Sequence, residues 1–249
     1  MKKIAVAAAA VLAFAIVLSG CQFNLFGVLD TIKIPSAGDL LTAASENAKG
    51  FVSDVQDYID SGAVTEDNAD DVVDALENVY TSQPDSETGQ RAAVLAGEIS
   101  ITSDPETKQV VDGVIETAMD TLNAGGDIDP ETLISNMFPP DLTQAGLTSI
   151  LDKLTQAADA YDSFGTHIAG ADDWMSSSEI GDVTQYAVVS MAVASIRLQL
   201  GPSADTDLYD VIYNGSALSA VDNPFDTTDG VSPYENGLTN ILNLAGLDL

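Results

Sequence analysis

Hydrophobic positions along most of this chain recur at the three- and four-residue spacing of an amphipathic helix. The clearest case is "DPETKQVVDGVIETAMDTL", residues 104–122, where Asp104 suits the N-cap and Pro105 the first helical position. One side of this segment is apolar, with Val110, Val111, Val114, Ile115, Ala118, Met119 and Leu122. Acidic residues occupy the other side. The segment is therefore predicted to be an amphipathic helix.

The same reasoning predicts helices over most of the remaining chain. They are expected at about 38–60, 65–80, 86–99, 141–170, 183–200, 203–213 and 232–244, with a short one opened by a second "DPET" at 129–132. Residues 222–230, "DNPFDTTDG", are predicted to form a polar loop. No segment combines strand alternation with a hairpin turn. The pattern predicts an all-α fold of about eight or nine helices, arranged as a bundle or an α-solenoid.

Residues 183–200, "VTQYAVVSMAVASIRLQL", are apolar nearly all round, which is typical of a helix at the centre of a bundle. The segment is not expected to span a membrane, because Gln185, Ser190, Ser195, Arg197 and Gln199 interrupt it. Arg197 needs a partner in so apolar a helix, and an Asp from a neighbouring element is the expected one. Contact with a ligand carboxylate is the alternative.

The first twenty residues have the pattern of a signal peptide. Lys2 and Lys3 precede an uncharged apolar stretch over 4–18, and Leu18-Ser19-Gly20-Cys21 follows. This tetrapeptide resembles the lipobox of bacterial lipoproteins. The resemblance implies that residues 1–20 are removed and that Cys21, the only cysteine, becomes an acylated N-terminus. The alternative is an ordinary secretory signal with a spare cysteine.

The resemblance also implies a cellular location and a division of the chain into segments. Residues 21–37 are expected to be the lipidated N-terminus and a tether, which packs on the domain or lies in the bilayer interface. Residues 38–249 are expected to form an acidic helical domain. In the lipoprotein class the residue after the cysteine influences sorting between membranes. An aspartate there retains many such proteins at the inner membrane, and this chain has Gln22 instead. A lipid-anchored protein of the cell envelope is expected, at the outer membrane in preference to the inner.

The expected helix pairs with short loops resemble the tetratricopeptide class of helical repeats. When "AADAY", residues 157–161, is aligned with the second helix of that repeat, the characteristic Trp, Gly and Tyr of the first helix are absent. The resemblance implies an α-solenoid arrangement of the helices.

Charge narrows the choice of partners. Removal of Lys2 and Lys3 leaves six basic residues against 39 acidic ones, a formal charge of −33. Nucleic acid and anionic headgroups are therefore poor partners, whereas cations and basic proteins are plausible ones. A hydrophobic content of 45% still favours a folded domain with an acidic surface. That surface suits either a saline habitat or general solubility.

Few residues suggest a catalytic, ligand-binding or metal-binding role. His167, the only histidine, is interpreted as a helix-end residue, with catalysis beside a carboxylate as the alternative. Two interpretations fit the run Asp172-Asp173-Trp174. It contacts a cation or another ligand, or the two aspartates are an exposed N-cap pair beside a buried tryptophan ring. Asp226 and Asp229 lie in a stretch that resembles a calcium loop without fitting an EF-hand. No metal site and no cofactor are expected.

These observations favour a non-catalytic, lipid-anchored helical module that binds or scaffolds another envelope protein. The alternative is a ligand- or cation-binding lipoprotein that delivers its cargo to a transporter, which a deep pocket lined from the 183–200 helix would favour. A hydrolase using His167 and a carboxylate comes third, because no nucleophile motif accompanies the histidine.

Overall fold

The computed structural model describes residues 33–123, 138–217 and 232–247, and these residues form helices and no strands. The α-helices are α2 (Ala37–Glu46), α3 (Ala48–Asp60), α4 (Glu66–Ser82), α5 (Glu87–Thr102), α6 (Pro105–Asn123), α8 (Gln144–Thr166), α9 (Ser177–Leu200), α10 (Ala204–Asn214) and α11 (Glu235–Leu244). Two single turns of 3-10 helix, η1 (Ala171–Asp173) and η2 (Gly201–Ser203), accompany them. The predicted all-α fold is confirmed.

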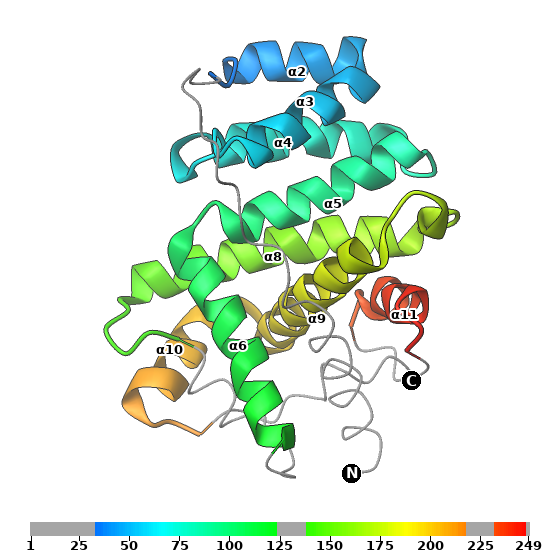
Figure 1. The fold of residues 1–249 in the computed structure, drawn as a ribbon. Helices are drawn as coiled ribbons and strands as arrows, with labels where there is room; N and C mark the ends of the chain where they lie inside the picture. Colours follow the sequence, from blue (N-terminus) through cyan, green and yellow to red (C-terminus); the bar gives the residue numbers. More distant parts are fainter. Residues whose placement is uncertain (1–32, 124–137, 218–231, 248–249) are drawn as a thin grey trace.

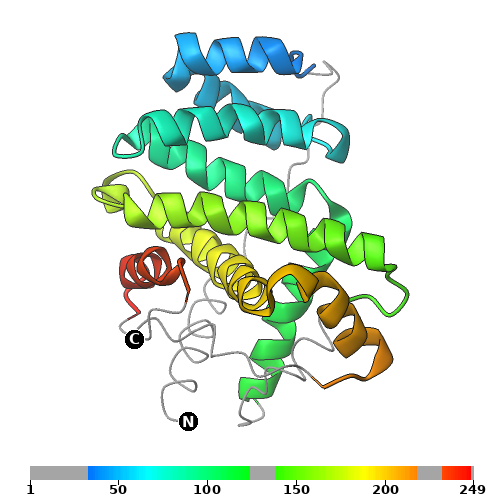
Figure 2. The ribbon, with the colours of Figure 1, turned by 180° about the vertical axis from the view of Figure 1, so that it is seen from behind.

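Six of the helices form three successive pairs, α2–α3, α4–α5 and α8–α9, which are stacked one on the next (Figure 1). Helices also contact the second neighbour along the chain, as α2 contacts α4 and α3 contacts α5. This pattern is that of an α-solenoid, in which each pair packs mainly on adjacent pairs. Helix α6 runs across the stack, and α10 and α11 pack against α8 and α9 (Figure 2).

The predicted single helix over 38–60 is wrong, because the helix breaks at Asn47. This residue has φ −149° and ψ 67°, and it ends α2 and caps α3. Its side-chain oxygen accepts a hydrogen bond from the backbone N–H of Gly50 at 3.2 Å. A Cβ on Gly50 would lie 2.2 Å from the Asn47 amide nitrogen, so the glycine makes room for the cap. Asparagine thus offers the backbone a local alternative to helix.

Several other boundaries differ from those predicted. Helix α8 begins at Gln144 behind a Thr143 cap and ends at Thr166, well inside the predicted 141–170. Helix α9 begins at Ser177, earlier than 183, because Ser176 and Glu179 form a capping box. The predicted helix start at 129–132 and the predicted loop at 222–230 lie outside the described residues.

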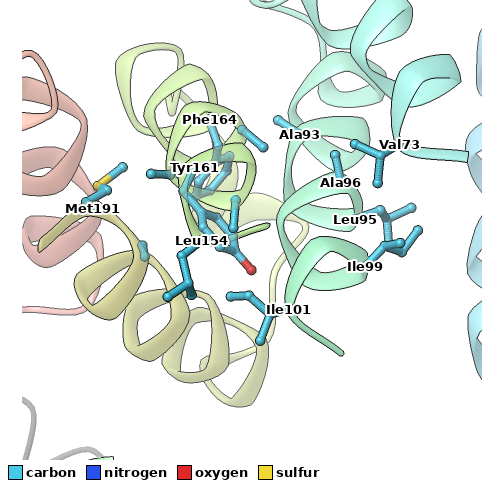
Figure 3. Close-up of a cluster of buried hydrophobic side chains, with 14 of the residues drawn as sticks. Val73, Ala93, Leu95, Ala96, Ile99, Ile101, Leu154, Tyr161, Phe164 and Met191 are labelled. Atoms are coloured by element: carbon cyan, nitrogen blue, oxygen red, sulfur yellow. The ribbon is translucent and has the colours of Figure 1, made fainter. Parts of the chain in front are cut away.

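The core is centred on α8, whereas the 183–200 segment was predicted to be central. Leu154, Tyr161 and Phe164 of α8 lie between Ala93, Leu95 and Ala96 of α5 and Met191 of α9 (Figure 3). Every residue over 187–196 is buried, which confirms the burial that the apolar pattern predicts, but α9 lies at the end of the stack and Leu198 is 55% exposed. Gly97 lets α5 approach α8 closely, since a Cβ there would lie 2.5 Å from Cζ of Tyr161.

Candidate functional site

A pocket of about 560 Å³ lies across α3, α5 and α9, with α8 contributing to it. Its apolar lining includes Val52, Val94, Leu95, Met175 and Val183. Its polar and aromatic lining includes Lys49, Glu87, Arg91, Glu98, Tyr161, Trp174, Glu179, Asp182 and Tyr186. Residues from helices far apart in sequence therefore meet here, as is usual for ligand pockets.

Tyr161 reaches the pocket from α8 and is fully buried. Its hydroxyl has no hydrogen-bond partner among the described residues. Burial raises the pKa of this phenol, and the nearby charges of Glu98 and Asp182 raise it further. A buried hydroxyl without a partner is unusual in a folded protein, and the pocket is where a partner would enter.

The carboxyl group of Glu98 lies in the same part of the pocket. Burial, reinforced by the acidic groups of Asp182, Asp60 and Glu179, raises its pKa to about 7. Burial and Glu179 also raise the pKa of Asp182. Glu98 is thus a half-buried carboxyl beside further acidic groups, which is a typical environment of functional carboxyl groups, whereas Asp182 and Glu179 are exposed.

Aromatic and basic groups occupy a second part of the pocket lining. The guanidinium of Arg91 lies 4.2 Å from the ring centroid of Trp174, and its Nε donates to Glu87 at 2.8 Å. The indole Nε1 of Trp174 donates to Oε1 of Gln90 at 3.2 Å. Gln90 is buried and donates in turn to the backbone carbonyls of His167 and Ala169. The face of Trp174 is therefore already engaged by a cation of the protein itself.

Among the sequence-predicted site residues that lie in the described ranges, only Trp174 lines this pocket. Asp172 and Asp173 lie in η1, are exposed and do not line it. Cys21, Asp226 and Asp229 lie outside the described residues.

Arg197 is paired as expected with aspartates of neighbouring segments. Its Nε and Nη2 donate to Asp205 at 2.8 and 3.0 Å, and Nη2 donates to Asp152 at 2.7 Å. Nη1 donates to the Thr155 hydroxyl at 3.1 Å. This set of contacts supports a structural role that links α8, α9 and α10 rather than contact with a ligand carboxylate.

His167 is the C-cap of α8, as the sequence predicted for a helix-end residue. Its Nδ1 lies 2.7 Å from Oδ1 of Asp85, whose side chain is 90% exposed. His167 does not line the pocket, so the histidine and carboxylate of the hydrolase hypothesis meet at the surface. Within the described ranges, no group of three His, Cys, Asp or Glu side chains is arranged to hold a metal ion.

Sequence reasoning missed the residues that make up the acidic part of the pocket. Tyr161 falls in the segment predicted to be helical over 141–170, and Glu98 and Asp182 resemble the many other acidic residues of the chain. In the structure Glu98 is half-buried and Asp182 is exposed. The one local signal is Glu98 itself, which follows the apolar run "AAVLAG" over 92–97.

None of the helices in the described ranges is long and apolar enough to cross a bilayer. No protein-family model, no curated protein and no solved structure matches this chain.

Proposed function

We propose that this protein is a lipid-anchored, non-catalytic binding module of the cell envelope, and that it binds a small ligand in the pocket between α3, α5 and α9. The observation that carries the proposal is the unpartnered, buried Tyr161 hydroxyl in a pocket of about 560 Å³. A volume of this order suits a small organic molecule. Of the roles expected from the sequence, this geometry favours the ligand-binding lipoprotein over a purely scaffolding module.

Native mass spectrometry tests the binding role. The full-length protein is incubated with a small-molecule extract of envelope material, and bound mass is recorded before and after denaturation. We expect a stoichiometric adduct on the wild-type protein. Val183→Trp, which fills the pocket from α9, should lose it, whereas Leu198→Trp, on the exposed face of the same helix, should keep it.

An adduct of equal occupancy on both variants would place binding outside the pocket. Absence of any adduct on the wild-type protein would remove the ligand-binding proposal. Circular dichroism of both variants checks that the helical fold is intact.

The anchor is the second part of the proposal, and the Leu18-Ser19-Gly20-Cys21 resemblance supports it. Several acyl chains, at ~0.8 kcal/mol per buried methylene, hold a protein at a bilayer far better than one chain does. The full-length protein should enter the detergent-rich phase on phase separation. Cys21→Ala should move it to the aqueous phase, while Ser19→Ala, which keeps a small residue before the cysteine, should not. Detergent partitioning of Cys21→Ala would contradict the anchor.

A further inference from the structure

We infer that the pocket binds an organic ammonium ion, a primary amine carried on an apolar chain. The inference rests on the proposed function and specifies the chemical class of its ligand. It depends on the polar groups that the pocket leaves unsatisfied, on the sign of the charge around them and on the apolar walls beside them.

The unsatisfied group is the hydroxyl of Tyr161, which is fully buried and without a partner in the described part of the chain. Its oxygen has lone pairs that accept a hydrogen bond from an N–H donor. An ammonium group offers three such donors. A ligand with a primary amine therefore satisfies this hydroxyl and has donors left for the neighbouring carboxylates.

The charge around the hydroxyl selects a cation. Glu98 and Asp182 are the acidic groups whose charges act on Tyr161, and neither carboxyl has an ion pair within the described ranges. Glu179 adds to the negative charge there. Beside these two acids a carboxylate or phosphate group would be repelled, whereas an ammonium within ~4–6 Å favours their ionised form. Binding of the amine would relieve part of their mutual repulsion.

A metal ion would find too few ligating side chains in this negatively charged part of the pocket. Ca²⁺ takes about six to eight oxygen ligands. In the described residues no three acidic, histidine or cysteine side chains converge in that way.

The rest of the lining indicates an apolar chain on the amine. Val52, Leu95, Met175 and Val183 present aliphatic and thioether groups, and a strongly hydrated inorganic ion makes no use of them. The guanidinium carbon of Arg91 already lies 4.2 Å from the ring centroid of Trp174. We therefore expect the ammonium to bind beside the acidic residues rather than on the indole. Lys49 and Arg91 also line the pocket and disfavour a second positive charge on the ligand.

Fluorescence provides a site-specific test, because Trp174 is the only tryptophan and lines the pocket. The full-length protein in detergent is titrated at pH 8 with n-hexylammonium chloride, n-hexanol and sodium hexanoate, which share one chain and differ in charge. We expect a saturable change in emission with n-hexylammonium, at least tenfold weaker binding of n-hexanol, and no saturable change with hexanoate.

Two variants separate recognition from folding. Glu98→Gln should weaken n-hexylammonium binding at least tenfold, and Tyr161→Phe should weaken it about fivefold. Removal of an unpartnered buried hydroxyl should leave thermal stability equal or higher, so weaker binding by Tyr161→Phe would not reflect a damaged fold. The control Glu77→Gln removes an exposed acid that does not line the pocket, and should bind as the wild type does.

Tighter binding of n-hexanol or hexanoate would overturn the ammonium inference and leave the proposed function standing. The same conclusion follows if no probe gives a saturable change while native mass spectrometry shows a pocket-dependent adduct. Equal binding of n-hexylammonium by wild type and Glu98→Gln would also overturn it. If neither the adduct nor the fluorescence change is seen, the inference and the proposed function both fail.

Discussion

At the scale of single residues, burial decides which of the many acidic groups matter. Most acidic residues in the described ranges are exposed, but Glu98 is partly buried near other acids and its pKa is raised to about 7. Asp162 is a second case, because burial and the charge of Asp159 raise its pKa to about 6. Both carboxyl groups hold a proton more tightly in the folded chain than in the unfolded one, so protonation stabilises the fold.

The pH dependence of stability follows from the direction of these shifts. The stabilisation by Glu98 is complete below its ordinary pKa of 4.5 and is lost as the pH rises through about 7. The free energy of unfolding should therefore fall from pH 5.5 to pH 8, with at most about 2 kcal/mol from this residue. Urea denaturation at the two pH values measures the fall. Glu98→Gln should make it smaller and Glu77→Gln should not, and an equal effect of the two variants would refute the assignment to Glu98.

Arg197 provides a second prediction for a single side chain. Arg197→Leu leaves Asp205, whose side chain is 25% exposed, and Asp152 without their cation. We expect a loss of ~1–3 kcal/mol in the free energy of unfolding, typical of hydrogen bonds to charged groups. Lys108→Gln, which breaks an exposed i,i+4 pair with Asp112, should change it by less than ~0.5 kcal/mol. A stable Arg197→Leu protein that no longer binds ligand would instead assign Arg197 to the site.

At the scale of elements, glycines set how closely the helices approach. Gly165 of α8 faces Gly237 of α11, and a Cβ on Gly165 would lie 2.3 Å from the carbonyl oxygen of Gly237. Gly97 likewise leaves room for the ring of Tyr161 against α5, and Tyr161 is one of the residues that line the pocket. No local pattern distinguishes these glycines from Gly38, which is in a helix with open space around it. Their role depends on which helix lies opposite.

Alanine substitution should separate the two kinds of glycine. Gly165→Ala forces backbone against backbone, so it should lower the free energy of unfolding by at least ~2 kcal/mol, within the range for strained or overpacked contacts. Gly38→Ala should raise it by up to ~1 kcal/mol, because alanine is the better helix former and nothing lies within 4 Å. Chemical denaturation checks both values, and a neutral Gly165→Ala would show that α11 does not pack as described.

At the scale of the whole molecule, the large excess of acidic over basic residues makes repulsion between carboxylates the main electrostatic effect on stability. The chain carries eight basic residues against 39 acidic ones, and in the described part Arg91, Lys108, Lys153 and Arg197 are each paired with an acid. The remaining acids repel one another through solvent. Salt shortens the Debye length from ~8 Å at physiological ionic strength to ~3 Å at 1 M, and so weakens this repulsion more than it weakens the close pairs.

The temperature of thermal unfolding, Tm, should therefore rise with salt concentration. We expect Tm to rise by several degrees between 0.1 and 1 M NaCl, followed by circular dichroism at the helix signal. KCl at equal concentration is the matched control and should act in the same way, because screening depends on ionic strength. A Tm that is flat or falls with both salts would remove the saline interpretation of the acidic surface, and an effect of one salt alone would indicate a specific ion site.

The sequence alone determined the fold class, most helix positions and several caps. These features depend on interactions within a few residues, such as the Asp104 carboxylate that accepts from the N–H of Glu106 at 2.9 Å. It also indicated that Arg197 needs an acidic partner, since an unpaired guanidinium is unfavourable in an apolar helix. It did not determine the break at Asn47, because competition between a side-chain cap and helix continuation is settled by a small free-energy difference.

Only the tertiary structure decided which helix is central and where a ligand pocket lies. Glu98, Tyr161 and Asp182 come from three helices, and each looks ordinary within its own segment. The raised pKa values of Glu98 and Tyr161 and the unsatisfied hydroxyl arise from burial, and the charge of the exposed Asp182 adds to both shifts; all of this depends on contacts between distant segments. Periodicity along the chain tells which face of each helix is buried, but it does not tell what lies opposite that face.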